Sequence, residues 1–398
     1  MAAARARFAG GALLAAGAFA VSLARAQEEH AKGGVDDVNP RAPTTPLKIE
    51  LAPYYCTQCV KEKLIPEEQR TINLYRAPVA NLVARLEIDE KEWMAVQTPH
   101  FVIFSTLQDT NVKYSDSVFA RFDLERLKPL KMKVQFGPEG AKVDAHARLH
   151  LYQVRLERLY AHFSALTNNT KPNLGMPTPY EIYLFRDYTQ HHAFVDTYFG
   201  RGQDKGGLQH HDREMPNFIL FTTAESVISE RFGKGDGSLA NHVMHNGAHV
   251  LIDGYNNYYR ETPAWLEEGL GHYYERRENI RINNFCCSEG KPPTEFIKPD
   301  WETTIFSIVR RDKDPPLVQW CEKKQPGEMT GIENGLSWGI VRWMVETEPI
   351  RFTKMLEPMD DLKLNLSSAQ LVDQAFGVSV SVLYQRWRDY VLQEWAGR

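Results

Sequence analysis

The sequence predicts an α+β fold in which a small mixed sheet is followed by a helical C-terminal lobe. A long amphipathic pattern over residues 145–166 predicts a helix with one apolar side turned to the core. A strand is expected at Tyr180, and two capped segments at residues 238–254 and 262–275 predict a pair of neighbouring helices. The main domain, residues 97–398, is long enough to bury a large core with two lobes.

The first helix of the pair carries two histidines with metal-ligand spacing. Ser238 is the expected N-cap, and Gly254 is placed to end the helix in a left-handed conformation. His245 and His249 are four residues apart, so both imidazoles project from one face of the helix. Two such imidazoles could bind one metal ion.

The second helix carries acidic and imidazole groups on one face. Thr262 is its expected cap. Pro263 suits the first turn because backbone N–H groups there make no hydrogen bond within the helix, so the absence of one costs nothing. Glu268, His272 and Glu275 follow at three-to-four spacing, so a carboxylate ligand at Glu268 would have His272 and Glu275 as supporting hydrogen-bond partners.

At these residues the chain resembles the gluzincin zinc metallopeptidases, the thermolysin- and aminopeptidase-type zincins, and in particular secreted bacterial proteins with a peptidase-MA-like domain. The family pattern is His-Glu-x-x-His, then about twenty residues, then Trp-Leu-x-Glu-Gly on the next helix. Here residues 245–249 are His-Asn-Gly-Ala-His and residues 265–269 are Trp-Leu-Glu-Glu-Gly. The resemblance implies a zincin-like fold, a Zn²⁺ ion and the ligands His245, His249 and Glu268.

The resemblance extends over about residues 97–395 and implies further elements. Residues 98–105 are similar to the first strand of that domain and residues 180–186 to another. Residues 217–222 resemble the edge strand that holds a peptide substrate, with Asn217, Phe218, Ile219 and Leu220 as substrate-binding residues. The helical tail of the domain resembles residues 336–345, 375–379 and 387–391.

Two departures from the family pattern concern catalysis. Asn246 stands where a zinc peptidase has the glutamate that takes a proton from the metal-bound water, and a carboxamide cannot act as this general base. Asn334 stands where related domains often have a tyrosine that helps to stabilise the oxyanion. Neither position is a ligand in the family, so we expect zinc binding to survive where efficient hydrolysis does not.

Two other polar residues near the motif, His242 and Glu267, are candidates to replace the missing base. His242 precedes His245 by three residues and could supply a fourth ligand or an alternative base, although a polar residue at the edge of the cleft is the preferred reading. Glu267 points about 100° away from Glu268 around the helix and is a poor substitute. Four other histidines are expected in loops or in contact with solvent: His191, His192, His210 and His211.

The N-terminus predicts export. Arg5 and Arg7 precede an apolar run at residues 8–23, and a small-residue cleavage site ends at Ala26, as in a secretory signal peptide. We therefore expect a secreted or periplasmic protein with no membrane span after signal removal. Residues 27–50 are polar and Pro-rich and predict a flexible leader.

Residues 51–96 predict an N-terminal extension with one charged helix near residues 67–86 and the first two of five cysteines. In an exported protein disulfides are the default, and an odd number leaves at least one thiol outside them. The preferred arrangement joins this extension to the segment after the Glu268 helix, and a four-thiolate zinc site is the alternative. The cysteines are Cys56, Cys59, Cys286, Cys287 and Cys321.

Composition argues against nucleic-acid and anionic-lipid partners. The chain has 47 basic and 51 acidic side chains, and removing the three arginines of the signal leaves 44 basic ones and a formal charge of −7. The preferred function is a zinc-binding, catalytically impaired metallopeptidase homologue that binds a peptide or protein. The alternatives are an active zinc metallopeptidase with a non-standard base and a structural exported domain without metal.

Overall fold

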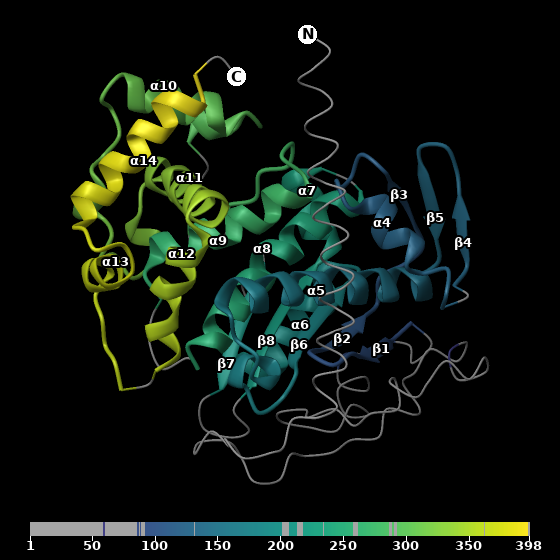
Figure 1. The fold of residues 1–398 in the computed structure, drawn as a ribbon. Coiled ribbons are helices and arrows are strands. Elements are labelled where there is room, and N and C mark those ends of the chain that lie inside the picture. Colours follow the sequence, from purple (N-terminus) through teal and green to yellow (C-terminus); the bar gives the residue numbers. More distant parts are fainter. Residues whose placement is uncertain are drawn as a thin grey trace. The chain divides into compact units, whose positions relative to one another are not determined.

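The computed structural model describes residues 92–130, 132–200, 207–212, 218–233, 235–257, 262–285, 293–361 and 363–396, with Cys59, Leu86, Ile88 and Glu289. This part of the chain has the predicted α+β fold, with a small mixed sheet and a helical C-terminal region (Figure 1). The predicted signal peptide, the flexible leader, Asn217 and three of the cysteines, Cys56, Cys286 and Cys287, lie outside the described residues. Within them, no helix is long and apolar enough to cross a membrane.

The main sheet is mixed and has the strand order β1-β2-β6-β8-β7. Strands β2, β6 and β8 are parallel, and β1 and β7 run antiparallel to them at the two edges. A second sheet has the order β3-β5-β4 and is antiparallel. The strands are β1 Met94–Gln97, β2 Phe101–Ser105, β3 Thr110–Lys113, β4 Val134–Phe136, β5 Gly140–Val143, β6 Tyr180–Phe185, β7 Gly207–Asp212 and β8 Phe218–Ala224.

The predicted edge strand is not at an edge, and this prediction was wrong. Strand β8 contains Phe218, Ile219 and Leu220, and it pairs with β6 on one side and β7 on the other. Its side chains are buried on both faces, with Ile219 in the core beneath the long helices and Phe218 and Leu220 in the core on the opposite face. Strand β7 was missed because Gln209, His210 and His211 interrupt any apolar run.

Helices α4, α5 and α6 lie between strands in the sequence, and α7 to α14 follow the last strand. The α-helices are α4 Ala120–Glu125, α5 Ala145–Thr167, α6 Tyr188–Phe199, α7 Glu225–Phe232, α8 Asp236–Tyr255, α9 Ala264–Glu278, α10 Trp301–Arg310, α11 Gly331–Thr347, α12 Pro349–Leu356, α13 Ser368–Phe376 and α14 Val380–Glu394. Short 3₁₀ helices lie at Pro172–Gly175, Thr294–Phe296, Leu317–Gln319, Pro326–Glu328 and Glu357–Asp360. Helix α5 begins at its predicted residue and ends one residue later than predicted.

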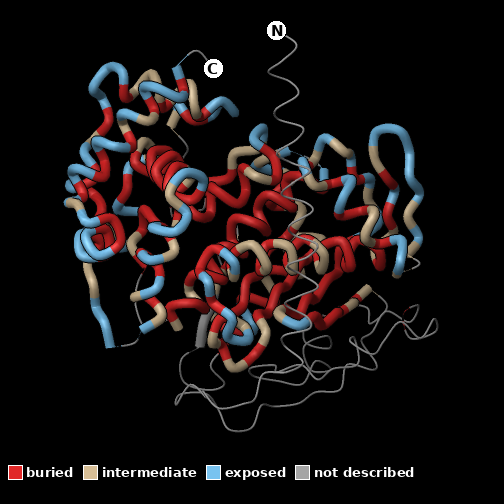
Figure 2. Tube along the Cα trace, in the orientation of Figure 1, coloured by how far each residue is buried: buried red, intermediate tan, exposed pale blue. Residues whose placement is uncertain are grey.

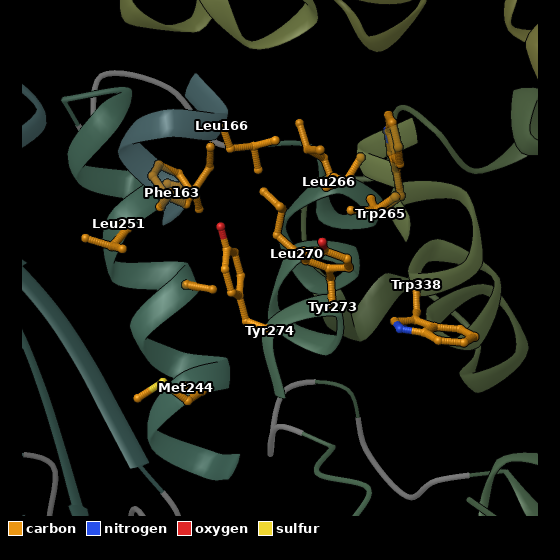
Figure 3. Packing of buried hydrophobic residues seen from close by; sticks show 14 of the residues in the cluster. Phe163, Leu166, Met244, Leu251, Trp265, Leu266, Leu270, Tyr273, Tyr274 and Trp338 are labelled. Carbon is orange, nitrogen blue, oxygen red and sulfur yellow. The ribbon is translucent and has the colours of Figure 1, made fainter. Parts of the chain in front are cut away.

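Helices α5, α8 and α9 pack together in the largest hydrophobic core of the described residues. The chain is almost wholly buried along α8 and α9 (Figure 2). Figure 3 shows Phe163 and Leu166 of α5, Met244 and Leu251 of α8, and Leu270 and Tyr274 of α9 meeting in one apolar cluster. A Cβ built on Gly247 would lie 2.7 Å from Cδ2 of Leu159, so glycine there allows α5 and α8 to approach closely.

The ends of the two central helices differ from the predictions. Helix α8 begins at Asp236 behind Gly235, whose φ of 127° favours glycine, and the predicted cap Ser238 lies inside the helix. Gly254 does not end the helix in a left-handed conformation. Instead it lets the helix pass Tyr180, because a Cβ there would lie 2.1 Å from the tyrosine hydroxyl oxygen. Pro263 is the N-cap of α9 and not its first helical residue.

Buried ion pairs hold both central helices against α5. Asp236, in the first turn of α8, accepts hydrogen bonds from Arg148 at 3.1 Å and from Arg155 at 2.6 Å. Glu278, the last residue of α9, lies 2.7 Å from Arg158. The pKa of Asp236, which burial alone would raise, is lowered because the two arginines outweigh desolvation. These contacts fix the relative positions of the helices that carry the histidine pair and Glu268.

Candidate metal centre

Helices α8 and α9 bring His245, His249 and Glu268 together. Nε2 of His245 lies 3.4 Å from Oε2 of Glu268, and Nε2 of His249 lies 3.7 Å from the same oxygen. The ring centroids of the two histidines are 4.7 Å apart. His245 and Glu268 are fully buried and His249 is 5% exposed, so three potential ligand atoms converge in the protein interior.

The three potential ligand atoms lie close together but do not hydrogen-bond to one another. Among the described residues, the two carboxylate oxygens of Glu268 have no hydrogen-bond partner, and Nε2 of His249 has none either. A buried carboxyl group with no donor loses several kcal/mol of hydration unless a cation or a donor replaces the water. Metal ligands lack mutual hydrogen bonds because their lone pairs all point at the ion, so a bound cation would account for this arrangement.

The backbone of α9 leaves room for the imidazoles only because residue 271 is glycine. A Cβ on Gly271 would lie 2.5 Å from Nε2 of His249 and 2.9 Å from Nε2 of His245. Real Cβ contacts do not reach such distances, so any larger side chain would displace the two nitrogens. Gly271 therefore lies directly against the two imidazole rings, a position that the helical spacing alone did not predict.

A hydrogen-bonded chain supports His245 from behind. Its Nδ1 lies 3.2 Å from Oε2 of Glu275, whose other oxygen lies 2.9 Å from Nδ1 of His272. Nε2 of His272 lies 2.9 Å from Oε1 of Glu289. An Nδ1–H bond to a carboxylate orients a histidine so that its Nε2 lone pair is available to a metal. His272 and Glu275 thus occupy the positions expected from the sequence.

The chain behind His245 is charged. Burial alone would lower the pKa of His272, but Glu289 and Glu275 outweigh burial and raise it to about 9. Burial alone would raise the pKa of Glu275, but His272 and the hydrogen bonds from His245 and His272 lower it. His272 is therefore an imidazolium between two carboxylates at neutral pH, which keeps Glu275 as an acceptor for His245.

Sequence reasoning missed two partners of the histidines. Helix geometry predicts that Glu267 points away from the site, yet its Oε1 lies 3.2 Å from Nδ1 of His249 and supports that imidazole as Glu275 supports His245. The length of the glutamate side chain permits this approach, which the direction of the Cα–Cβ bond does not predict. Glu289 was missed because it lies beyond α9, where no local spacing connects it to His272.

The residue in the general-base position is held in the helix. Nδ2 of Asn246 donates to the carbonyl oxygen of His242 at 2.9 Å, and the side chain is 8% exposed. The amide therefore bonds to its own helix, one turn back. The other position at which the chain departs from the family pattern, Asn334, is fully buried on α11, and among the described residues its amide has no hydrogen-bond partner.

His242, expected at the edge of the cleft, is 4% exposed. Its ring lies 5.7 Å from that of Phe221 on β8, and it joins none of the potential metal-binding clusters of the described residues. Burial, and after it the neighbouring His245, lowers the pKa of His242 to about 3. An imidazole with this pKa is a weak base at neutral pH.

The structure places the other four histidines on a helix and a strand. His191 is fully buried on α6, and burial lowers its pKa to about 4, so the expected contact with solvent was wrong. His192 follows it on the same helix and is partly buried. His210 and His211 lie on strand β7 and not in a loop, and their side chains are outside the described part.

The described cysteines are Cys59 and Cys321, both buried. No disulfide joins these two. The predicted disulfide between the N-terminal extension and Cys286 or Cys287 involves residues outside the described part of the chain. Sγ of Cys59 lies instead beside His146 and His150 of α5.

Comparison with known proteins leaves this geometry as the basis for a functional assignment. No protein-family model matches the chain. No curated protein matches it either. The buried cluster of His245, His249 and Glu268 could hold a metal ion, and the function of the chain has to be argued from that cluster and its surroundings.

Proposed function

We propose that this chain is a secreted, zinc-binding protein of the gluzincin type whose peptidase activity is impaired and which binds a peptide or protein. The observation that carries the proposal is the buried Glu268 carboxylate, which faces the Nε2 atoms of His245 and His249 at 3.4 and 3.7 Å without a hydrogen-bond partner in the described residues.

The donor set and its dimensions favour zinc. Two imidazoles and one carboxylate are a ligand set of catalytic zinc sites, which leave a fourth position open. With Zn–N and Zn–O distances of about 2.0–2.2 Å, tetrahedral ligands lie about 3.4 Å from one another. The separations from Glu268 to the two histidines lie close to this value. A zinc ion held there would supply Lewis acidity toward a carbonyl group.

The residues around the ligands support loss of the general base. The Asn246 amide cannot accept a proton near neutral pH, and its Nδ2 donates to the carbonyl oxygen of His242. An active peptidase would need another base, and the sequence favours His242 over Glu267 as that alternative. Its burial and its pKa of about 3 argue against that role. We therefore favour a binding protein over an active zinc metallopeptidase.

The peptide-binding part of the proposal needs a different strand from the one expected. Extended peptides add to a sheet at an unpaired edge, and both sides of β8 are already paired. Strand β7 is the edge next to it, and it runs antiparallel to β8. A peptide held by strand addition on this side of the sheet would therefore pair with Gly207–Asp212.

The experiment is a zinc titration followed by a restoration assay. Wild-type protein should bind zinc at a site that the His245→Ala/His249→Ala variant lacks. Asn246→Glu should then raise hydrolysis of peptide substrates, with Asn246→Gln as the matched control that keeps an amide. Equal zinc binding in wild type and double variant would refute the site, and a loss of hydrolysis in Asn246→Glu would mean that Asn246 has a catalytic role of its own.

A further inference from the structure

A second group of metal-binding side chains lies on helix α5, where no metal site was expected. Sγ of Cys59 lies 2.9 Å from Nε2 of His146 and 3.4 Å from Nε2 of His150. All three side chains are buried, with exposures of 0%, 6% and 3%. Together they form a potential metal-binding cluster that shares no residue with the one on α8 and α9.

The two histidines are four residues apart near the start of a long helix. Residues at this spacing lie on one helix face, and the ring centroids of His146 and His150 are 4.9 Å apart. Asp144 caps the helix by accepting from the backbone N–H of Ala147 at 2.8 Å. Arg148, between them in sequence, is held by Asp236 and Glu225, so this turn of α5 is fixed before any metal binds.

Hydrogen bonding alone explains this cluster poorly. A thiol can donate one hydrogen bond and its sulfur is only a weak acceptor, yet two imidazole nitrogens face the same sulfur atom. Nδ1 of His150 lies 2.6 Å from Oε1 of Gln153, so it carries the ring proton and leaves the Nε2 lone pair toward Cys59. Nδ1 of His146 is buried and has no hydrogen-bond partner among the described residues. Lone pairs that converge on one point in this way suit a cation.

The separations fit a tetrahedral zinc ion. With Zn–S of about 2.3 Å and Zn–N of about 2.0–2.1 Å, the sulfur and nitrogen ligands of such an ion lie about 3.6 Å apart. The observed 2.9 and 3.4 Å would need only a small outward movement. A thiolate with two imidazoles is a donor set that favours zinc over Mg²⁺ or Ca²⁺, which prefer oxygen.

We propose that Cys59, His146 and His150 form a structural zinc site that ties the N-terminal extension to α5. On binding, the Cys59 thiol releases its proton to solvent and the thiolate bonds to Zn²⁺, while both imidazoles bind through neutral Nε2. Full burial of the sulfur argues against the alternative of a thiolate nucleophile.

The test separates this site from the one on α8 and α9. In the His245→Ala/His249→Ala background, zinc titration of the full chain should still give one tightly bound ion. Adding Cys59→Ser should remove it, with an affinity loss beyond the roughly 10–100-fold that changes outside the ligand shell produce. Cys321→Ser, which removes a buried cysteine elsewhere, is the matched control and should keep the ion.

A measurement on the unmodified cysteine covers the case in which Cys59→Ser does not fold. Cobalt(II) bound to the His245→Ala/His249→Ala protein should show a thiolate-to-cobalt charge-transfer absorption, and zinc should slow alkylation of Cys59 in partly denaturing urea. Absence of that absorption, together with alkylation at the same rate with and without zinc, would overturn the proposal. Its outcome is independent of whether His245 and His249 bind metal.

Discussion

The Gly271→Ala substitution would test the geometry of the α8–α9 centre with a single methyl group. Its Cβ would lie 2.5 Å from Nε2 of His249 and 2.9 Å from Nε2 of His245, whereas ordinary contacts begin near 3.4 Å. The two nitrogens would have to move by about 0.5–0.9 Å, and zinc sites tolerate departures of only about 0.2 Å in their ligand distances. We therefore expect zinc affinity to fall by about 100-fold, the upper end of the range for residues that orient ligands.

The assay is the gain in unfolding free energy on adding zinc. At a free zinc concentration of about 100 times the wild-type Kd of the α8–α9 site, this site should contribute about 2.7 kcal/mol in wild type, and only about 0.4 kcal/mol in a variant with 100-fold weaker binding. Zinc bound at Cys59, His146 and His150 adds the same amount to both proteins, so the difference between the two gains is the quantity to compare. The new methyl group also lowers the unfolding free energy of the metal-free protein, typically by about 1–3 kcal/mol. The change on adding zinc is compared, and not the absolute stability, because this cost cancels in the difference. Chemical denaturation with and without zinc gives both quantities.

Gly247→Ala is the matched control, because it adds a methyl group to the other ligand helix without approaching the ligand nitrogens. Its Cβ would press on Cδ2 of Leu159 at 2.7 Å, so the metal-free protein should lose stability. The gain from zinc should remain that of wild type. A full gain from zinc in Gly271→Ala would refute the placement of the ion between His245 and His249.

Three further predictions concern catalysis, pH dependence and packing. Restoring the base with Asn246→Glu should raise peptide hydrolysis by about 10²- to 10⁴-fold in a fluorogenic peptide assay, and no increase would mean that the proton acceptor is not what the site lacks. Burial raises the pKa of Glu181 to about 8, so its contribution to stability is fully present below its unfolded pKa and is lost as pH rises through 8. Glu181→Gln should therefore match wild type near pH 4 and exceed it in unfolding free energy near pH 8, and identical pH profiles would contradict the assignment. Asp236→Asn should cost about 3–5 kcal/mol, because it leaves Arg148 and Arg155 buried without a carboxylate, and a loss below 1 kcal/mol in urea unfolding would show that the pair does not fix α8.

Local periodicity was enough to predict the helices of the site, and non-local contacts explain what it missed. The i, i+4 spacing of His245 and His249 and the face shared by Glu268, His272 and Glu275 placed five side chains that the structure brings together. Helix ends were less predictable because Gly235 and the arginines of α5, rather than a serine cap, determine where α8 begins.

The predictions that were wrong or missing concern contacts between residues far apart in the chain. Strand β7 is polar in sequence and is a strand because it pairs with β8, so its position at the edge could not be seen in an apolar pattern. Cys59 and His146 are 87 residues apart, and only the fold shows that they meet. The cysteines alone suggested disulfides or a four-thiolate site, and the imidazole partners supplied by α5 carried no local signal.

The most direct test of the central claim is the zinc content of the purified protein, prepared without chelator and without metal-affinity resin. We predict two zinc ions per chain in wild type and one in the His245→Ala/His249→Ala variant, with circular dichroism to establish that both are folded. Equal zinc content in the two proteins, persisting after incubation with zinc, would contradict the claim that His245, His249 and Glu268 hold a metal ion.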